Sequence, residues 1–269
     1  MIKSQVKTIA ANALDQLTSA LKAGQSDTLK DYLQAMARFH RYSWFNSVLI
    51  YCQRPTAQHV AGFATWKRFN RSVKKGEKGI AILVPIKCIA RRSEPDPEEF
   101  DRNVIGFTQG YVFDVEQTEG QPLPAFATIQ GDPGSYTAKL RGFIAQQGIS
   151  LEYVEGLGGA KGASSGGRIR ILQNLQPAEE FQTLAHELAH ELLHKGARRA
   201  ETDLSVRELE AEAVAFVVST GLCLDTNTSS ADYIKLYNGD DQMLTRSLSH
   251  IQNAASSILV NLLGGGGEK

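Results

Sequence analysis

The sequence contains one H-E-x-x-H motif, formed by His186, Glu187 and His190. Residues four apart share one face of an α-helix, so both histidines can direct an imidazole nitrogen at the same ion. Zinc accepts neutral imidazole, and a catalytic zinc site keeps one position open for water. Glu187 can act there as the general base. The motif therefore predicts a site for one Zn²⁺ ion, or another divalent metal in its place, which a third ligand must complete.

The residues around the motif favour a helix over 177–195. Pro177 suits the first helical turn, and the two glutamates that follow it suit the positive end of the helix dipole. Apolar residues then recur at helical spacing. His194 lies four residues past His190, but a lone histidine near a helix end is more often a capping or solvated group. We therefore leave His194 out of the predicted site.

The third ligand is expected on a second helix, which contains Glu208, Glu210 and Glu212. Glu208 and Glu212 are four residues apart and share a face, whereas Glu210 lies off it. Glu212 borders the apolar run 213–218, where a carboxylate is costly unless it is paired or bound to metal. We therefore predict Glu212 as the ligand. Glu208 is the alternative ligand, or else it completes a capping box with Ser205 or hydrogen-bonds a ligand histidine. The rival, a row of solvated glutamates, fits Glu208 and Glu210 better than Glu212.

The cysteine pattern and the apolar runs limit where the chain can work. Its three cysteines are far apart and form no C-x-x-C pair, which argues against a disulfide framework or a thiolate zinc site. That usage fits a reducing cytoplasm. No apolar run has the length of a membrane span or the position of a signal peptide. We therefore expect a cytoplasmic protein that does not interact with a membrane.

The net charge of zero hides a strong asymmetry along the chain. Residues 1–92 contain 16 Lys and Arg against 4 Asp and Glu, a net charge of +12, and the remainder carries −12. Halves of opposite sign suggest two domains with different partners. The Q-T-E-G-Q-P-L-P run at 117–124 marks a boundary. We predict an α+β protein with two domains, residues 1–125 and residues 126–269.

The basic half has the composition of a single-stranded-DNA-binding domain. Aromatic side chains that stack on bases, beside cations that neutralise phosphates, bind single strands without reading sequence. Trp44, Phe45 and Phe63 are more readily explained as core residues, and Trp66 is balanced between core and stacking. Duplex DNA is a further candidate partner. The predicted DNA contacts are Trp66, Lys67, Arg68, Arg71, Lys74, Lys75 and Lys78.

Strand-like runs occur in both predicted domains. In the first domain they lie at 80–86 and 104–115. In the second, residues 168–172 follow a glycine-dense segment and precede the motif helix. A strand edge there could hold an extended peptide beside the metal by β-augmentation. An ordinary sheet strand explains residues 168–172 at least as well.

Several strings resemble the ArdC-type antirestriction proteins of mobile genetic elements. They are S-W-F-N at 43–46, G-F-A-T-W-K at 62–67, V-K-K-G-E-K-G at 73–79, V-F-D-V at 112–115 with Q-T-E-G at 117–120, and H-E-L-A-H at 186–190. The resemblance implies an N-terminal single-stranded-DNA-binding domain and a C-terminal zincin-like metallopeptidase domain. The second half also resembles ImmA/IrrE-type peptidases, whose later Glu-Ala-x-x-Phe falls on Glu212 to Phe216.

The resemblance implies that the protein protects incoming plasmid or conjugating DNA from host restriction. The three ligands would make the second domain a zinc-dependent metallopeptidase of the gluzincin type. Two rivals remain open. In the first, the protein coats DNA and its metal site is structural. In the second, it is a regulatory peptidase that cuts a protein substrate, either a repressor or a restriction subunit, while DNA only recruits it.

Overall fold

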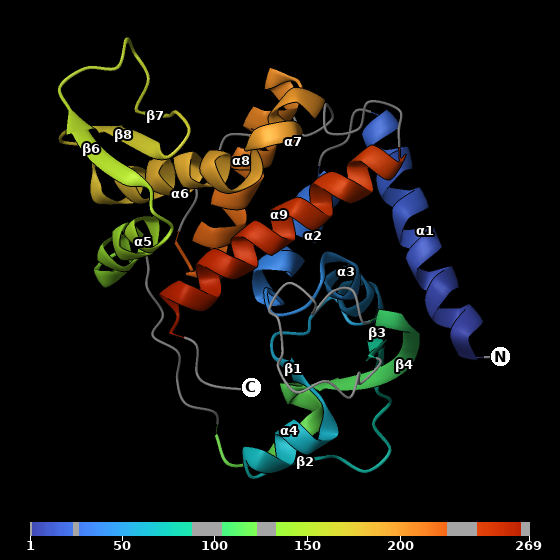
Figure 1. The fold of residues 1–269 in the computed structure, drawn as a ribbon. Helices are drawn as coiled ribbons and strands as arrows, with labels where there is room; N and C mark the ends of the chain where they lie inside the picture. The colour runs from blue at the N-terminus through green and yellow to red at the C-terminus, as the bar shows by residue number, and fades with distance from the viewer. Residues whose placement is uncertain (1, 24–26, 88–103, 123–132, 225–240, 265–269) are drawn as a thin grey trace, which may run out of the picture. The chain divides into compact units, whose positions relative to one another are not determined.

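A computed structural model describes residues 2–23, 27–87, 104–122, 133–224 and 241–264 (Figure 1). Helices and strands are both present, and the predicted α+β class with two domains is confirmed. The chain divides into two compact units. The first contains residues 1–15 and 48–124, and the second contains residues 16–47 and 125–269. The division after residue 124 follows the proline-containing run, but residues 16–47 join the second unit instead of the first.

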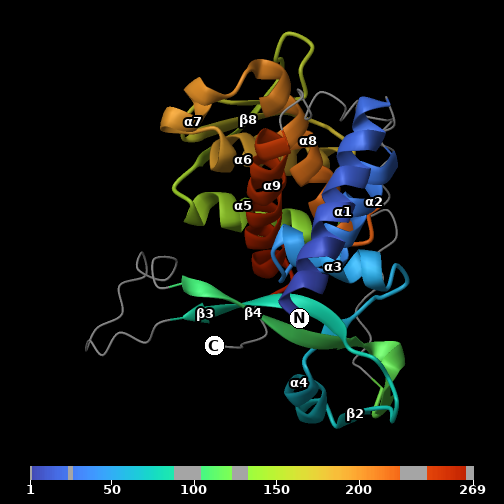
Figure 2. The same ribbon diagram turned by 90° about the vertical axis from the view of Figure 1, so that its right-hand side faces the viewer.

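The first unit is built on antiparallel strands. Its three-stranded sheet has the order β1-β4-β3, and a second sheet pairs β2 with β5. Figure 2 shows β3 and β4 as a long two-stranded ribbon. The elements are α3 (Trp44–Gln53), which begins in the second unit, β1 (Val60–Ala61), α4 (Phe63–Arg68), β2 (Arg71–Val73), β3 (Ile80–Lys87), β4 (Val104–Asp114), the short 3₁₀ helix η2 (Val115–Gln117) and β5 (Thr118–Gly120).

Trp66 belongs to the core of the first unit. Only 2% of its surface is exposed. Its indole Nε1 donates a hydrogen bond of 2.9 Å to the backbone carbonyl of Phe113, which satisfies the one polar group of the ring. The ring is therefore not available to stack on a base, and the prediction of Trp66 as a DNA contact is wrong. The sequence could not show whether Trp66 is a core residue or a base-stacking residue, because an aromatic residue next to cations along the chain is compatible with both roles.

The second unit combines a small mixed sheet with a helical bundle. The strand order is β6-β8-β7, with β8 parallel to β6 and antiparallel to β7. In Figure 1, α6 runs alongside β8. The elements of the second unit are α2 (Asp27–Arg38), α5 (Ser135–Gln146), β6 (Ser150–Val154), β7 (Gly162–Ser164), β8 (Arg168–Leu172), α6 (Pro177–Leu193), α7 (Gly196–Glu201), α8 (Leu204–Gly221) and α9 (Asp241–Leu262). Helix α1 (Ile2–Lys22) is shared between the two units.

The centre of the sheet is β8, which pairs with a neighbour on each side. Its backbone donors and acceptors are therefore engaged along both edges, and it cannot accept a further strand. The suggestion that residues 168–172 hold an extended peptide is wrong for this reason. Among the described strands of this unit, β7 is the edge strand that packs against α6.

The core of the second unit lies where α2, α6, α8 and α9 meet. Phe181, Leu184 and Leu188 of α6 are fully buried, as the helical spacing of apolar residues requires. The later half of α8 is also buried on most of its surface. This packing places the polar face of α6 against the first turns of α8, and so positions the motif.

Two further observations concern cysteines and membranes. Cys52 and Cys223 are not in disulfides, and Cys88 lies outside the described residues. Within the described ranges, no helix combines the length and the apolar character needed to cross a membrane.

Candidate metal centre and predicted DNA contacts

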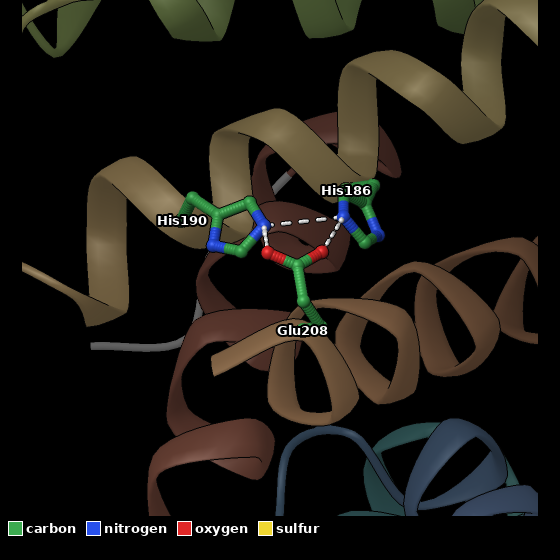
Figure 3. Close-up of side chains that lie close together, drawn as sticks. All are labelled: His186, His190 and Glu208. Atoms are coloured by element: carbon green, nitrogen blue, oxygen red, sulfur yellow. Dashed lines mark hydrogen bonds and ion pairs between the residues drawn. The ribbon is translucent and has the colours of Figure 1, made fainter. Parts of the chain in front are cut away.

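The H-E-x-x-H residues lie on α6, as the periodicity predicted, and face the start of α8. The N-cap of α8 is Asp203, whose side chain accepts a hydrogen bond from the backbone N–H of Val206 at 2.8 Å. Because Asp203 caps the helix, Glu208 is not needed for that task. Its carboxylate points toward the imidazoles of His186 and His190 (Figure 3).

The donor atoms of these three residues have the spacing of metal ligands. The Nε2 atoms of His186 and His190 lie 3.1 Å apart. The carboxylate of Glu208 lies 3.4 Å from each of them, through Oε2 to His186 and Oε1 to His190. Two ligands at zinc–nitrogen distances and a tetrahedral angle are about 3.3 Å apart. His186, His190 and Glu208 therefore fit one face of a tetrahedral site.

Glu212 lies on the other side of His186. Its Oε2 is 3.4 Å from His186 Nδ1, the nitrogen that faces away from His190. A carboxylate in that place orients a ligand histidine rather than holding the ion. The geometry thus favours Glu208 as the third ligand and Glu212 as its supporting partner, the reverse of the predicted order. The Glu208 side chain is 52% exposed and the Glu212 side chain 26% exposed, so burial and donor geometry point to different glutamates.

The electrostatics of the site favour a cation. Burial lowers the pKa of His186, but hydrogen bonds with Glu208 and Glu212 outweigh it and raise that pKa to about 9. Hydrogen bonds from His186 and His190 hold the pKa of Glu208 well below its ordinary value. The carboxylates therefore draw a proton onto the histidine. A divalent cation would supply that positive charge in place of the proton.

Glu187 is buried beside the ligands and next to β7. Burial raises its pKa, although the nearby charges of His186 and His190 act in the opposite direction. A Cβ built on Gly162 of β7 would lie 2.7 Å from both Cγ and Oε1 of Glu187. The glycine therefore lets the edge strand pass directly over this carboxylate. Glu187 therefore lies between the candidate metal ligands and the edge of β7.

A buried chain of polar side chains lies behind His190, and no sequence pattern predicted it. His194 Nδ1 lies 3.0 Å from His190 Nδ1, and His194 Nε2 lies 3.0 Å from Glu210 Oε2. Arg198 pairs with the other oxygen of Glu210. The side chains of His194 and Glu210 are fully buried. His194 is the C-cap residue of α6, as one of the two expectations had it, but the expectation that His194 or Glu210 is solvated is wrong.

This chain of hydrogen bonds sets the tautomer of His190. Burial raises the pKa of Glu210, but hydrogen bonds from His194, Ser247 and Arg198 outweigh it and lower that pKa below its ordinary value. The carboxylate thus accepts the Nε2–H of His194, which leaves a lone pair on its Nδ1. That lone pair accepts the Nδ1–H of His190. The Nε2 lone pair of His190 then faces the site, as a metal ligand requires.

We expect His194→Ala to weaken the affinity for a divalent ion by about 10- to 100-fold, as for other partners that orient a metal-ligating histidine. Isothermal titration of the metal-free protein with Zn²⁺ measures it. His40→Ala is the matched control, because His40 is half-buried in the same unit and lies 3.4 Å from the carbonyl of Ala37 instead. An affinity of His194→Ala equal to that of the control would show that His194 does not orient His190.

The predicted DNA contacts lie in the first unit and differ in their availability. Lys75 and Lys78 are exposed in the turn between β2 and β3. Lys74 is exposed and donates to the carbonyl of Glu116 at 2.9 Å. Lys67 and Arg68 are exposed on α4. These residues are placed where a phosphate can reach them.

Arg71 differs from the other predicted cations because the protein itself uses its guanidinium. It donates to the hydroxyl of Thr118 at 2.8 Å and to the carbonyls of Thr118, Gly120 and Gln121. These bonds hold β5 against β2. Arg71 is therefore a structural residue in this fold, and its assignment as a DNA contact is not supported by its geometry.

Comparison with known proteins gives a consistent class for each part of the chain. Residues 5–113 match the N-terminal domain of anti-restriction factor ArdC. Residues 146–236 match the IrrE N-terminal-like domain of the M78 peptidase family. The chain therefore joins an ArdC-type N-terminal domain to a peptidase-like domain. The resemblance to ArdC-type antirestriction proteins drawn from its motifs is confirmed.

Solved structures have a similar fold, and one curated protein is similar in sequence. The metal-free crystal structure of antirestriction protein ArdC from plasmid R388 is 18% identical and aligns with a TM-score of 0.54 over 94% of this chain and 97% of that chain. The Mn(II)-bound structure of the same protein has 18% identity and a TM-score of 0.55 over 95% and 98%. An uncharacterized protein of Bacillus anthracis is 23% identical over 96% of this chain, which spans 51% of that relative's length.

Proposed function

We propose that the second unit is a divalent-metal-dependent peptidase whose ion is held by His186, His190 and Glu208. The triangle of donor atoms 3.1 to 3.4 Å apart carries this proposal. Two imidazoles and one carboxylate are the ligand set of catalytic zinc sites, and imidazole also accepts other transition metals. The related R388 protein has been crystallised with Mn(II), so Mn²⁺ is a second candidate. An ion there would supply Lewis-acid polarisation of a peptide carbonyl.

The chain's own residues provide the remaining functions of such a site. Glu187 has a raised pKa because it is buried, which suits a carboxylate that takes a proton and returns it to a leaving amine. The edge of β7 lies next to Glu187 and can hold an extended peptide by strand addition. Glu212 and His194 keep the two ligand histidines oriented.

We further propose that the first unit binds single-stranded DNA and that this binding brings the protein to incoming DNA. The exposed cations Lys67, Arg68, Lys74, Lys75 and Lys78 support the proposal because phosphate contacts dominate such binding. Together, the two units would protect transferred DNA from restriction. The affinity must then fall as salt rises, since released counterions drive the association.

The substitution Glu187→Gln separates the two units experimentally. We expect it to lower hydrolysis of an unfolded protein substrate by about 10²- to 10⁴-fold, the usual loss when a general base is removed. Single-stranded-DNA binding in a gel shift should be unchanged, because the DNA-binding unit is intact. Hydrolysis that survives the substitution, with metal still bound, would contradict the role of Glu187.

The same variant decides how the DNA is protected. A restriction-protection assay in cells compares wild type with Glu187→Gln at equal expression. Protection that is lost while DNA binding is retained would assign it to cleavage of a protein. Equal protection would assign it to coating of DNA by the first unit, which the exposed cations there favour as the second candidate mechanism.

A further inference from the structure

An exposed row of aromatic side chains follows one face of β4. Phe107 and Tyr111 are 55% and 50% exposed, which is unusual for such large rings on a regular strand. They share this face with Gln109, because alternate residues of a strand point the same way. Gln109 donates a hydrogen bond of 2.8 Å to the hydroxyl of Tyr111 and so restrains the ring. The face is therefore both apolar and ordered.

The row continues onto α4. Phe113, the next residue on this face of β4, meets Phe63 edge-on, with ring centroids 6.5 Å apart and planes at 70°. Phe63 is 49% exposed. The ammonium of Lys67, one helical turn further along, lies 5.0 Å from the centroid of the Phe63 ring. An aromatic surface thus ends beside a positive charge.

The basic turn passes against the same rings. A Cβ built on Gly79 would lie 2.9 Å from Cβ of Tyr111 and 3.1 Å from Cζ of Phe113. Only a glycine lets the end of the turn approach the aromatic face this closely. Lys75 and Lys78 lie in this turn and are exposed. Cations therefore border the aromatic face along the turn as well as at α4.

Hydrogen bonds from the Gln117 side chain hold the turn in a fixed shape, and one of them engages the only carboxylate of the turn. The buried amide of Gln117 donates to the carboxylate of Glu77 at 2.8 Å and to the carbonyl of Lys78 at 2.9 Å. The side chain of Gln117 also accepts from the backbone N–H of Asp114. These bonds fix the turn, in which Glu77 and the lysines are all exposed, and they engage the Glu77 carboxylate with the protein.

We propose that Phe63, Phe107 and Tyr111 form a base-stacking platform for single-stranded nucleic acid, with Lys67, Lys75 and Lys78 as its phosphate contacts. This inference rests on the proposed DNA-binding function and assigns it to a surface that does not include Trp66. Aromatic faces bordered by cations are complementary to a strand that carries bases and phosphates together. A protein partner would use the apolar rings but not the surrounding cations.

The geometry also predicts how the platform reads its ligand. Phe107 and Tyr111 are four residues apart on one strand, a separation of about 13 Å, so they stack on different bases. Stacking uses the face of a base, which all four bases possess. Binding should therefore tolerate any sequence and should prefer single strands, whose bases are free to stack.

The test measures the affinity of the full-length protein for a fluorescent oligo-dT by anisotropy at several salt concentrations. Tyr111→Ala and Phe107→Ala should each weaken binding by about 5- to 150-fold. Tyr111→Phe keeps the ring and should stay within about twofold of wild type. Ile86→Ala is the matched control, because Ile86 is an exposed apolar residue, 39% accessible, on the other face of the same ribbon.

The salt dependence distinguishes stacking from charge. The alanine variants of the rings should keep the wild-type slope of log K against log salt, whereas Lys78→Ala should reduce its magnitude by about 0.7. Ring variants that bind like wild type, while Lys78→Ala weakens binding, would overturn the platform and leave DNA binding intact. A wild type that does not bind at all would instead refute the proposed DNA-binding function.

A second copy of the chain is the alternative occupant of this face. Sedimentation of wild type and Tyr111→Ala decides between the two. We expect the same oligomeric state for both. A dimer that dissociates in the variant, with unchanged DNA affinity, would assign the face to self-association and overturn the proposal.

Discussion

Replacing His186 or His190 by alanine is expected to weaken divalent-metal binding by more than about 100-fold, beyond the loss seen for outer partners of a metal site. Each histidine supplies one donor nitrogen of a triangle whose sides are 3.1 to 3.4 Å. A site with one nitrogen removed has two protein ligands, fewer than a catalytic zinc site uses. Titration calorimetry of metal-free protein with Zn²⁺ and with Mn²⁺ measures the loss.

The same titration identifies the third ligand. We expect Glu208→Ala to weaken metal binding as much as the histidine variants do. Glu212→Ala should weaken metal binding by only about 10- to 100-fold, because it removes a residue that orients a ligand. The opposite order would restore the assignment of Glu212 that burial suggested. Thermal unfolding gives an independent readout, because metal at 100 times its Kd stabilises the wild type by about 2.7 kcal/mol. Variants that cannot bind metal should show no such shift.

Replacing Glu210 by alanine is expected to lower the free energy of unfolding by about 3–5 kcal/mol. Glu210 is fully buried and pairs with both Arg198 and His194. Removing the carboxylate leaves a largely buried guanidinium and a buried imidazole without their acceptor. Breaking one side of such a pair costs far more than the pair contributes, because the remaining charge stays desolvated. Urea unfolding of the metal-free protein, followed by circular dichroism, measures the change.

Two controls make this second result specific. Glu201→Ala removes an exposed carboxylate from α7 of the same unit and should change the stability by no more than about 0.5 kcal/mol. Glu210→Gln keeps the shape of the side chain and one acceptor oxygen. We therefore expect it to lower the free energy of unfolding less than Glu210→Ala does. A cost below about 1 kcal/mol for Glu210→Ala would mean that the buried network does not form.

The strings that identify the family owe much of their content to folding. Asp114 is buried and accepts backbone N–H groups of Gln58 and His59, at 3.0 and 3.2 Å. Gly120 has φ +136°, and a Cβ there would lie 2.3 Å from the carbonyl of Asn70. These residues fix the strands around the basic turn. A string shared within a family is thus not in itself a list of ligand contacts.

The prediction of helices succeeded where one face is apolar over several turns. The motif helix, expected over 177–195, is α6 (Pro177–Leu193). The division of the chain into two units was harder to predict than its helices. Residues 16–47 follow the basic composition of the first half, yet they pack with the second unit. Composition gives the net charge of each part of the chain. It does not show which element an apolar helix face packs against, because that depends on the apolar faces of the other elements.

The sequence alone determined that two potential metal ligands of the second unit share one helix face. H-E-x-x-H works through local geometry, since helical spacing brings His186 and His190 to one face wherever the helix lies. It also determined where cations concentrate. Local rules could not decide which glutamate of α8 faces the histidines, because that depends on how α8 packs against α6.

Only the tertiary structure decided which polar and aromatic groups are buried. Glu210 and His194 meet across two helices, and Trp66 reaches a carbonyl on a distant strand. Phe107 and Tyr111, in contrast, are half exposed on the same strand as the buried Val112. Burial is a property of the surroundings that packing creates. A sequence can state which side chains are able to stack, pair or bind metal, but the contacts between distant segments select which of them do.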